Sequence, residues 1–122
     1  MNLLKQVAAQ LAFMGFGRLD GEIFWGRMPD APDGCVGVFS MDSGVAGGSA
    51  RVQVLIRDAG DGAAYEKACR IAQALDGFRG FLGGDGAEAK ITVAGAAAGQ
   101  GEDGRLRALY SVELDVMYGD EE

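Results

Sequence analysis

The chain has 122 residues, of which 48% are apolar, and a formal net charge of −7 with no histidine. This length predicts one domain over residues 1–122 with a real hydrophobic core, and the apolar content excludes a wholly disordered chain. The acidic charge argues against nucleic-acid binding, and no apolar run approaches the ~20 residues of a membrane helix.

The first element is a predicted amphipathic helix over about residues 3–14, with Asn2 as its cap. Glycines at 15 and 17 end it. Its apolar residues fall at the spacing of one helical face, which marks the side that meets the core. These residues are Leu3, Leu4, Val7, Leu11 and Met14.

Two predicted strands follow, at residues 21–28 and 35–40, and the turn "PDAPDG" joins them. Proline cannot donate a hydrogen bond to a strand ladder, so both prolines belong to the connection. Phe24 and Trp25 are neighbours in the first strand and therefore point to opposite faces of it. The first helix or a partner subunit is expected to cover Trp25, and the sequence leaves this choice open.

Residues 41–50, "MDSGVAGGSA", read as a flexible loop, and no lysine stands in it to hold a phosphate. The next run, at residues 51–58, alternates apolar and polar side chains and predicts a half-buried strand. Its apolar side chains are Val52, Val54 and Ile56.

A second helix is predicted after Asp61, which is a plausible cap, and Gly77 ends it. One face of this helix is apolar or small, and the opposite face is charged. The apolar face comprises Tyr65, Ala68, Cys69, Ala72 and Leu75.

The final third predicts a short strand at 90–95, a small-residue loop at 95–104 and a long last strand at 105–118. The last strand, fully extended, would span ~46 Å. A compact domain of this length is only ~35 Å across. The strand is therefore expected either to bulge near Ser111 or to project toward a neighbouring subunit.

These elements predict an α+β fold: a largely antiparallel β-sheet, covered on one face by two α-helices, with a long C-terminal strand. The sequence offers little for catalysis, because histidine is the commonest general base and metal ligand. Cys35 and Cys69 are expected to be small hydrophobes, and the acids Asp30 and Asp33 solvated turn residues. We therefore expect no enzyme, no cofactor and no metal site.

Four segments of the chain resemble the minor-capsid and tail-terminator (tail-completion) proteins of long-tailed bacteriophages. They are the first helix ending in "GFG", the run "IFWGRMPDAPDGCVGVF", the run "VQVLIRDAGDGAAYEKACRIAQALDGF" and the closing "GEDGRLRALYSVELDVMY". The more specific features are the strand that ends at Arg57, followed by Tyr65 and an alanine-rich helix, and the turn at residues 103–105.

The resemblance implies a structural virion protein of the tail or neck, assembled in the bacterial host cytoplasm. Its subunits would form a ring, typically hexameric, at the head-proximal end of the tail tube. The ring would end tube polymerisation, contact the tail tube protein and offer a joining surface to the head-completion or connector protein.

Two other readings stay open at this point: a head-completion or minor capsid protein at the neck, and a small ligand-binding or enzymatic domain. For the ring, the expected subunit or partner contacts are polar strand residues and one aromatic residue. These are Arg51, Arg57, Arg105, Arg107, Glu113, Asp115 and Trp25.

Overall fold

The computed structural model describes residues 2–41 and 48–118. Six strands form one sheet in the order β1-β2-β3-β6-β5-β4. The elements, in chain order, are α1 (Leu3–Phe13), β1 (Ile23–Trp25), β2 (Cys35–Ser40), β3 (Ser49–Asp58), α2 (Asp61–Leu75), β4 (Arg79–Phe81), the short 3₁₀ helix η1 (Leu82–Gly84), β5 (Glu88–Glu102) and β6 (Ala108–Tyr118).

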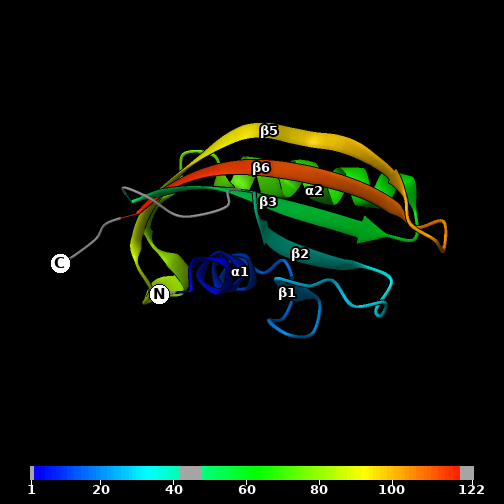
Figure 1. Ribbon diagram of the computed structural model, residues 1–122, viewed down its shortest axis with the longest axis horizontal. Coiled ribbons are helices and arrows are strands. Elements are labelled where there is room, and N and C mark those ends of the chain that lie inside the picture. Colours follow the sequence, from blue (N-terminus) through cyan, green and yellow to red (C-terminus); the bar gives the residue numbers. More distant parts are fainter. Residues whose placement is uncertain (1, 42–47, 119–122) are drawn as a thin grey trace.

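The sheet is curled along its length, as Figure 1 shows. Every neighbouring pair of strands is antiparallel except β1 and β2, which run parallel. Two helices and a mostly antiparallel sheet with a long last strand confirm the predicted α+β fold.

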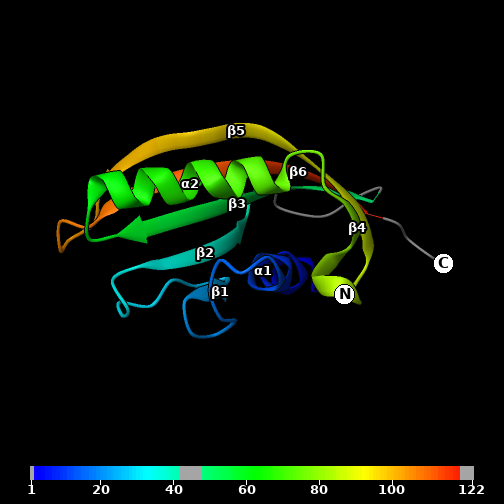
Figure 2. The same cartoon turned by 180° about the vertical axis from the view of Figure 1, so that it is seen from behind.

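One face of the sheet carries the core, because alternate residues of β3 and β6 point to the same side. Val52 lies opposite Leu114 and Val54 opposite Val112, and all four are buried. Helix α2 lies along β3, β6 and β5, while α1 lies beside β1 and β2 (Figure 2). Both helices therefore cover this inner face, as the sequence predicts.

Helix α1 begins and ends where the sequence predicts. The Asn2 side chain accepts a hydrogen bond from the Lys5 N–H, and Gly15 has a positive φ of 91° just after the helix. Two glutamines on this helix have a role that the apolar pattern does not show. The side-chain oxygen of Gln10 accepts from the Gly83 N–H, and that of Gln6 accepts from the Ala87 N–H. They fix the segment around η1 to the helix.

Helix α2 ends before Gly77, as predicted, but Asp61 does not cap it. The cap position is Gly60, and the Asp61 carboxylate instead accepts a hydrogen bond of 2.8 Å from the Tyr110 hydroxyl of β6. This bond raises the pKa of Tyr110. Tyr65, predicted on the buried face, is about half exposed and packs edge to face on Tyr110.

The predicted small-residue loop at 95–104 is wrong, because β5 continues through it to Glu102. Alanine and glycine are weak strand formers, yet pairing with the strongly strand-forming β6 holds them extended. The pairing of β5 with β6 is irregular as a result. Its register shifts at three places, between Val93 and Gly95, Gly95 and Ala98, and Gly99 and Glu102.

These shifts also correct the position of the bulge that was expected in the last strand near Ser111. The β3–β6 register is unbroken from Ser49 opposite Met117 to Asp58 opposite Ala108. The irregularities lie in the partner strand β5, where Ala98 stands opposite Ser111. Bulges bend a strand and increase its twist, which accounts for the curl of the sheet at this edge.

The predicted loop at 41–50 is only partly testable, since residues 42–47 lie outside the described residues; β3 already begins at Ser49. Within residues 2–41 and 48–118, no helix is long and apolar enough to cross a membrane.

Candidate functional site

The connection between β1 and β2 lies on the outer face of the sheet, opposite the helices. Parallel neighbours require the chain to return past the strand, so this connection is not the tight turn that the sequence indicates. It passes close over Gly37, where an added Cβ would stand 3.3 Å from the Arg27 carbonyl oxygen and 2.7 Å from the Phe39 ring. There is no room for a side chain at position 37 beneath this connection.

Phe24 and Trp25 point to opposite faces, as predicted. Phe24 is buried, with the Arg27 guanidinium 4.9 Å from the centre of its ring. Trp25 packs against the core as a half-buried side chain, with the Lys5 ammonium of α1 5.6 Å from its ring centre. The monomer thus supplies the first cover for Trp25.

Arg57, near the end of β3, lies beneath the β1–β2 connection and holds it in place. Its guanidinium donates to the carbonyl oxygens of Pro29 at 2.6 Å, Pro32 at 2.8 Å and Asp33 at 3.1 Å. Only 4% of Arg57 is exposed. Cys35 stands opposite it in β2 and is a buried free thiol, whose pKa is raised by burial.

Arg107 fixes the same connection from its other side and is only 5% exposed. It pairs with the carboxylates of Asp30 at 2.8 Å, Asp33 at 3.1 Å and Asp103 at 2.8 Å. It also donates to the Asp30 carbonyl oxygen. Arg57, Arg107 and residues 29–33 are called the arginine clamp below.

The electrostatics of the clamp follow from these bonds. The Asp103 carboxylate accepts from the backbone N–H of Arg107, and this bond is the main reason that the pKa of Asp103 is lowered to about 2. The hydrogen bond that the Arg107 guanidinium donates to the Asp103 carboxylate is in turn the main reason that the pKa of Arg107 is raised. Both groups stay charged at neutral pH.

The β5–β6 hairpin turn lies beside the clamp. The Leu106 N–H donates to the Asp103 carbonyl oxygen, and the Asp103 N–H donates to that of Arg107. Leu106 takes the left-handed position of this turn, with φ 61°, and is 72% exposed. Arg105, next to it, forms an exposed ion pair with Asp30 at 2.8 Å.

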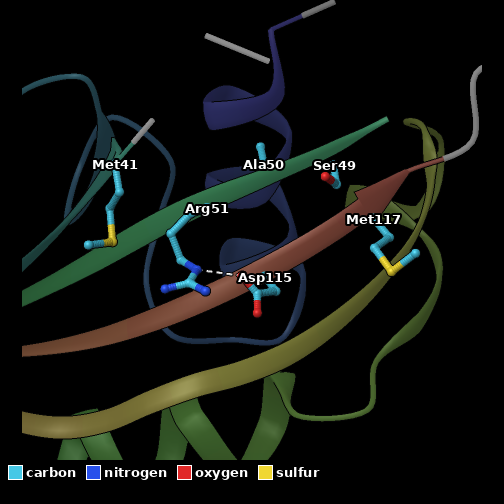
Figure 3. Close-up of a pocket in the computed structure, with 6 residues that line it drawn as sticks. All are labelled: Met41, Ser49, Ala50, Arg51, Asp115 and Met117. Carbon is cyan, nitrogen blue, oxygen red and sulfur yellow. Dashed lines mark hydrogen bonds and ion pairs between the residues drawn. The ribbon is translucent and has the colours of Figure 1, made fainter. Parts of the chain in front are cut away.

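A second polar cluster lies at the other end of the outer face, where β3 and β6 carry an Arg51–Asp115 ion pair (Figure 3). Glu113 stands 3.8 Å from the same guanidinium. Arg51 is 39% exposed at its side chain. A cavity of about 650 Å³ opens here, with two exposed methionines, Met41 and Met117, at its rim. Arg51, Glu113, Asp115 and these methionines are called the Arg51 patch.

The seven predicted contact residues therefore fall into three places. Arg51, Glu113 and Asp115 come together in the Arg51 patch; Arg57, Arg105 and Arg107 gather at the clamp; and Trp25 lies apart on the inner face. Arg57 and Arg107 are buried in the monomer and bonded to it, so a free surface role does not fit them.

Sequence reasoning missed the acids that Arg107 holds. Asp30 and Asp33 read as solvated turn residues, and each of them pairs with Arg107. Their partner lies more than 70 positions along the chain. The available signal was an arginine at 57 beside the apolar Ile56 of a strand, and another at 107 just before the last strand. Among residues 2–41 and 48–118, no group of three histidine, cysteine or carboxylate side chains is placed to hold a metal ion.

Comparison with known proteins gives a family for this fold. A solved structure with 13% sequence identity superimposes with a TM-score of 0.52, covering 83% of this chain and 81% of that chain, and supports the fold alone. No curated protein matches the chain at a significant level. The family model described as bacteriophage tail terminator protein matches residues 11–116. These residues include Arg51, Glu113 and Asp115 and the whole arginine clamp. The chain belongs to the bacteriophage tail terminator family, whose members are structural proteins of the phage tail.

Proposed function

We propose that this protein forms a homo-oligomeric ring, with six subunits, at the head-proximal end of the tail tube. There the ring ends tube polymerisation and provides the surface to which the head-completion protein joins. The observation that carries this proposal is the family match over residues 11–116. The whole chain, residues 1–122, acts as one domain in it, and the role requires no catalysis.

The Arg51 patch supports a contact with another protein. Arg51, Glu113 and Asp115 carry both signs of charge on the solvent face of the two central strands, between exposed methionines. Exposed charge pairs contribute little to the stability of a monomer, but they select partners with complementary charge. Methionine adds an adaptable apolar contact. We assign this patch to the tail tube or the head-completion protein.

The arginine clamp supports the same role in another way. It orders a connection that carries both prolines, so that a loop without regular structure becomes a rigid rim at one end of the sheet. A preordered loop loses less conformational entropy when a partner binds. Arg105 is the part of this rim that stays exposed to a neighbour.

The proposal is tested with purified protein and polymerising tail tube protein. We expect light scattering to show a ring-sized species in the presence of tubes, and electron microscopy to show it at one tube end. Tubes grown with the protein should be shorter than tubes grown without it. Binding to the connector without any change in tube length would instead indicate a head-completion protein at the neck. No binding to either would overturn a tail or neck role.

A further inference from the structure

Two cations face each other on neighbouring strands at the end of the sheet where β6 finishes. Arg79 of β4 lies directly opposite Lys90 of β5, and both side chains are exposed. Like charges that stand opposite each other destabilise an antiparallel pair. Within residues 2–41 and 48–118 neither of them forms an ion pair, although the chain has 18 acidic residues and only 11 basic ones. Arg79 and Lys90 are called the basic corner.

Protection of the sheet edge explains only one of these two cations. An edge strand often carries a cation that keeps other strands away, and Arg79 on β4 fits that role. Lys90 does not, because β5 lies between β4 and β6 at this position. A hollow of about 400 Å³ opens beside both cations, and Glu88, Met117 and Tyr118 also line it. The basic corner is therefore accessible to an anionic group from outside the monomer.

The opposite end of the sheet carries carboxylates outside the arginine clamp. Asp58 of β3 and Glu102 of β5 both stand opposite Ala108 of β6, so their side chains lie on one face of the sheet. Asp61 begins α2 directly after β3. In the described part of the chain, none of these three carboxylates forms an ion pair. Asp58, Asp61 and Glu102 are called the acidic end.

The basic corner and the acidic end cannot meet within one chain. Lys90 lies opposite Met117, near the end of β6, whereas the acidic end lies level with Ala108, where β6 begins. The stretch of strand between these two positions spans roughly 30 Å. Figure 1 accordingly shows the start of β5 and the β5–β6 turn at opposite ends of the sheet.

We propose that the basic corner of one copy of this protein binds the acidic end of the next copy. Each surface offers charge without an ion-pair partner in the monomer, and its sign is the one that the other surface requires. The attraction offsets part of the repulsion between copies that each carry a net charge of −7. The inference rests on the proposed ring and names the contact between its subunits.

The contact joins two different surfaces head to tail. Such a contact closes into a ring when the rotation between copies allows it. Lys90 shares the outer face of the sheet with Met117, while the acidic end shares the inner face with the buried Ala108 and with α2. Neighbouring copies in the ring therefore overlap, with the outer face of one against the inner face of the next.

The test exchanges the charges of the two surfaces. The first variant carries Arg79→Glu and Lys90→Glu, which make the basic corner acidic. The second carries Asp58→Asn, Asp61→Asn and Glu102→Lys, which make the acidic end basic. The two new amides keep an oxygen that accepts the hydrogen bonds of the aspartates they replace. Circular dichroism checks that both variants fold.

Light scattering in the presence of tail tubes then measures the ring species. Each variant alone should lose it at least about tenfold, because its two surfaces now carry the same sign of charge. An equal mixture of the two should regain it, since the altered corner of one variant fits the altered end of the other. Rings formed by either variant alone, or a mixture of folded variants that forms none, would overturn the proposal.

A single variant separates the contact from folding. Arg79→Glu converts the opposed like charges into a pair with Lys90, so the melting temperature of the monomer should rise by about 1 to 4 °C while the ring species is weakened. A folding defect would lower the melting temperature instead. The matched control is Arg70→Glu, which makes the same change of charge at an exposed position of α2 and should leave the ring intact. Equal loss of the ring in both variants would contradict the contact.

Tube length distinguishes this contact from the proposed function. If wild-type protein forms rings and shortens tubes, and the variant with Arg79→Glu and Lys90→Glu does both equally well, the contact is wrong and the proposed function stands. If wild-type protein forms no ring and leaves tube length unchanged, the proposed function fails and the contact fails with it.

Discussion

The arginine clamp and the Arg51 patch both pair arginine with carboxylates near β3 and β6, yet they differ in what the arginines can do. Arg57 and Arg107 are at most 5% exposed and hold a loop through its carbonyl oxygens and the carboxylates of Asp30 and Asp33. Arg51 keeps 39% of its side chain exposed and pairs with two strand carboxylates. A buried charge without its partners is costly, whereas an exposed pair is screened by water and salt. The clamp therefore holds the fold together, whereas the patch is the surface that we propose meets a partner.

The largest effect is expected from reversing charge in the clamp. Arg107→Glu places a carboxylate among Asp30, Asp33 and Asp103, so we expect most of the protein to unfold or aggregate. Arg105→Glu, two residues away and exposed, is the matched control and should fold. Circular dichroism compares them. A folded Arg107→Glu monomer of normal melting temperature would show that the clamp is dispensable.

A smaller loss is expected when Arg57 is truncated. Arg57→Ala leaves three carbonyl oxygens of the connection without their donor, and we expect the free energy of unfolding to fall by about 2 kcal/mol or more. Urea denaturation measures this change. Arg57→Lys should recover part of the loss, because it restores a charge but not the planar fork of donors. An unchanged midpoint in Arg57→Ala would contradict the assigned role.

The clamp should also give the fold an acid-sensitive part. The pKa of Asp103 is about 2 in the folded chain, below its ordinary value of 3.8. A depressed pKa contributes stability that is complete above about pH 4 and is lost as the pH falls toward 2. The difference in stability between wild type and Asp103→Asn should therefore shrink between pH 5 and pH 2. A constant difference, measured by urea denaturation at several pH values, would contradict this assignment.

The smallest effect on the monomer is expected in the Arg51 patch. Arg51→Ala should change the free energy of unfolding by less than about 1 kcal/mol, since surface ion pairs contribute 0 to 1 kcal/mol. The same variant should weaken binding to tail tubes or to the head-completion protein, and added salt should weaken wild-type binding in the same way. Pelleting with tubes measures the first partner. Stability lost to the same extent as in Arg57→Ala would remove the contrast between the two regions.

Sequence alone predicted the parts of the fold that local patterns control. The caps and apolar faces of α1, the strands β2, β3 and β6, and the opposite orientation of Phe24 and Trp25 all follow from side-chain spacing. The extent of β5 did not follow, because its alanines and glycines are extended only through pairing with β6. The parallel β1–β2 pair and the acids around Arg107 also escaped, since they depend on contacts between distant positions.

The candidate site shows the same limit. In a strand whose side chains alternate between apolar and polar, each polar residue is predicted to be exposed. This pattern holds for Arg51 and Arg57 alike. Only the position of the β1–β2 connection decides that Arg57 lies under a loop while Arg51 faces solvent. The positive φ of Leu106 is likewise a property of backbone geometry, and no residue pattern predicted it.

The most direct test of the central claim is the length of tails made in infected cells when this protein is absent. The proposed role as a tail terminator predicts tails that grow well beyond normal length and fail to join heads, with normal length restored by wild-type protein. Electron microscopy of lysates gives the length distribution. Tails of normal, uniform length in its absence would contradict the account.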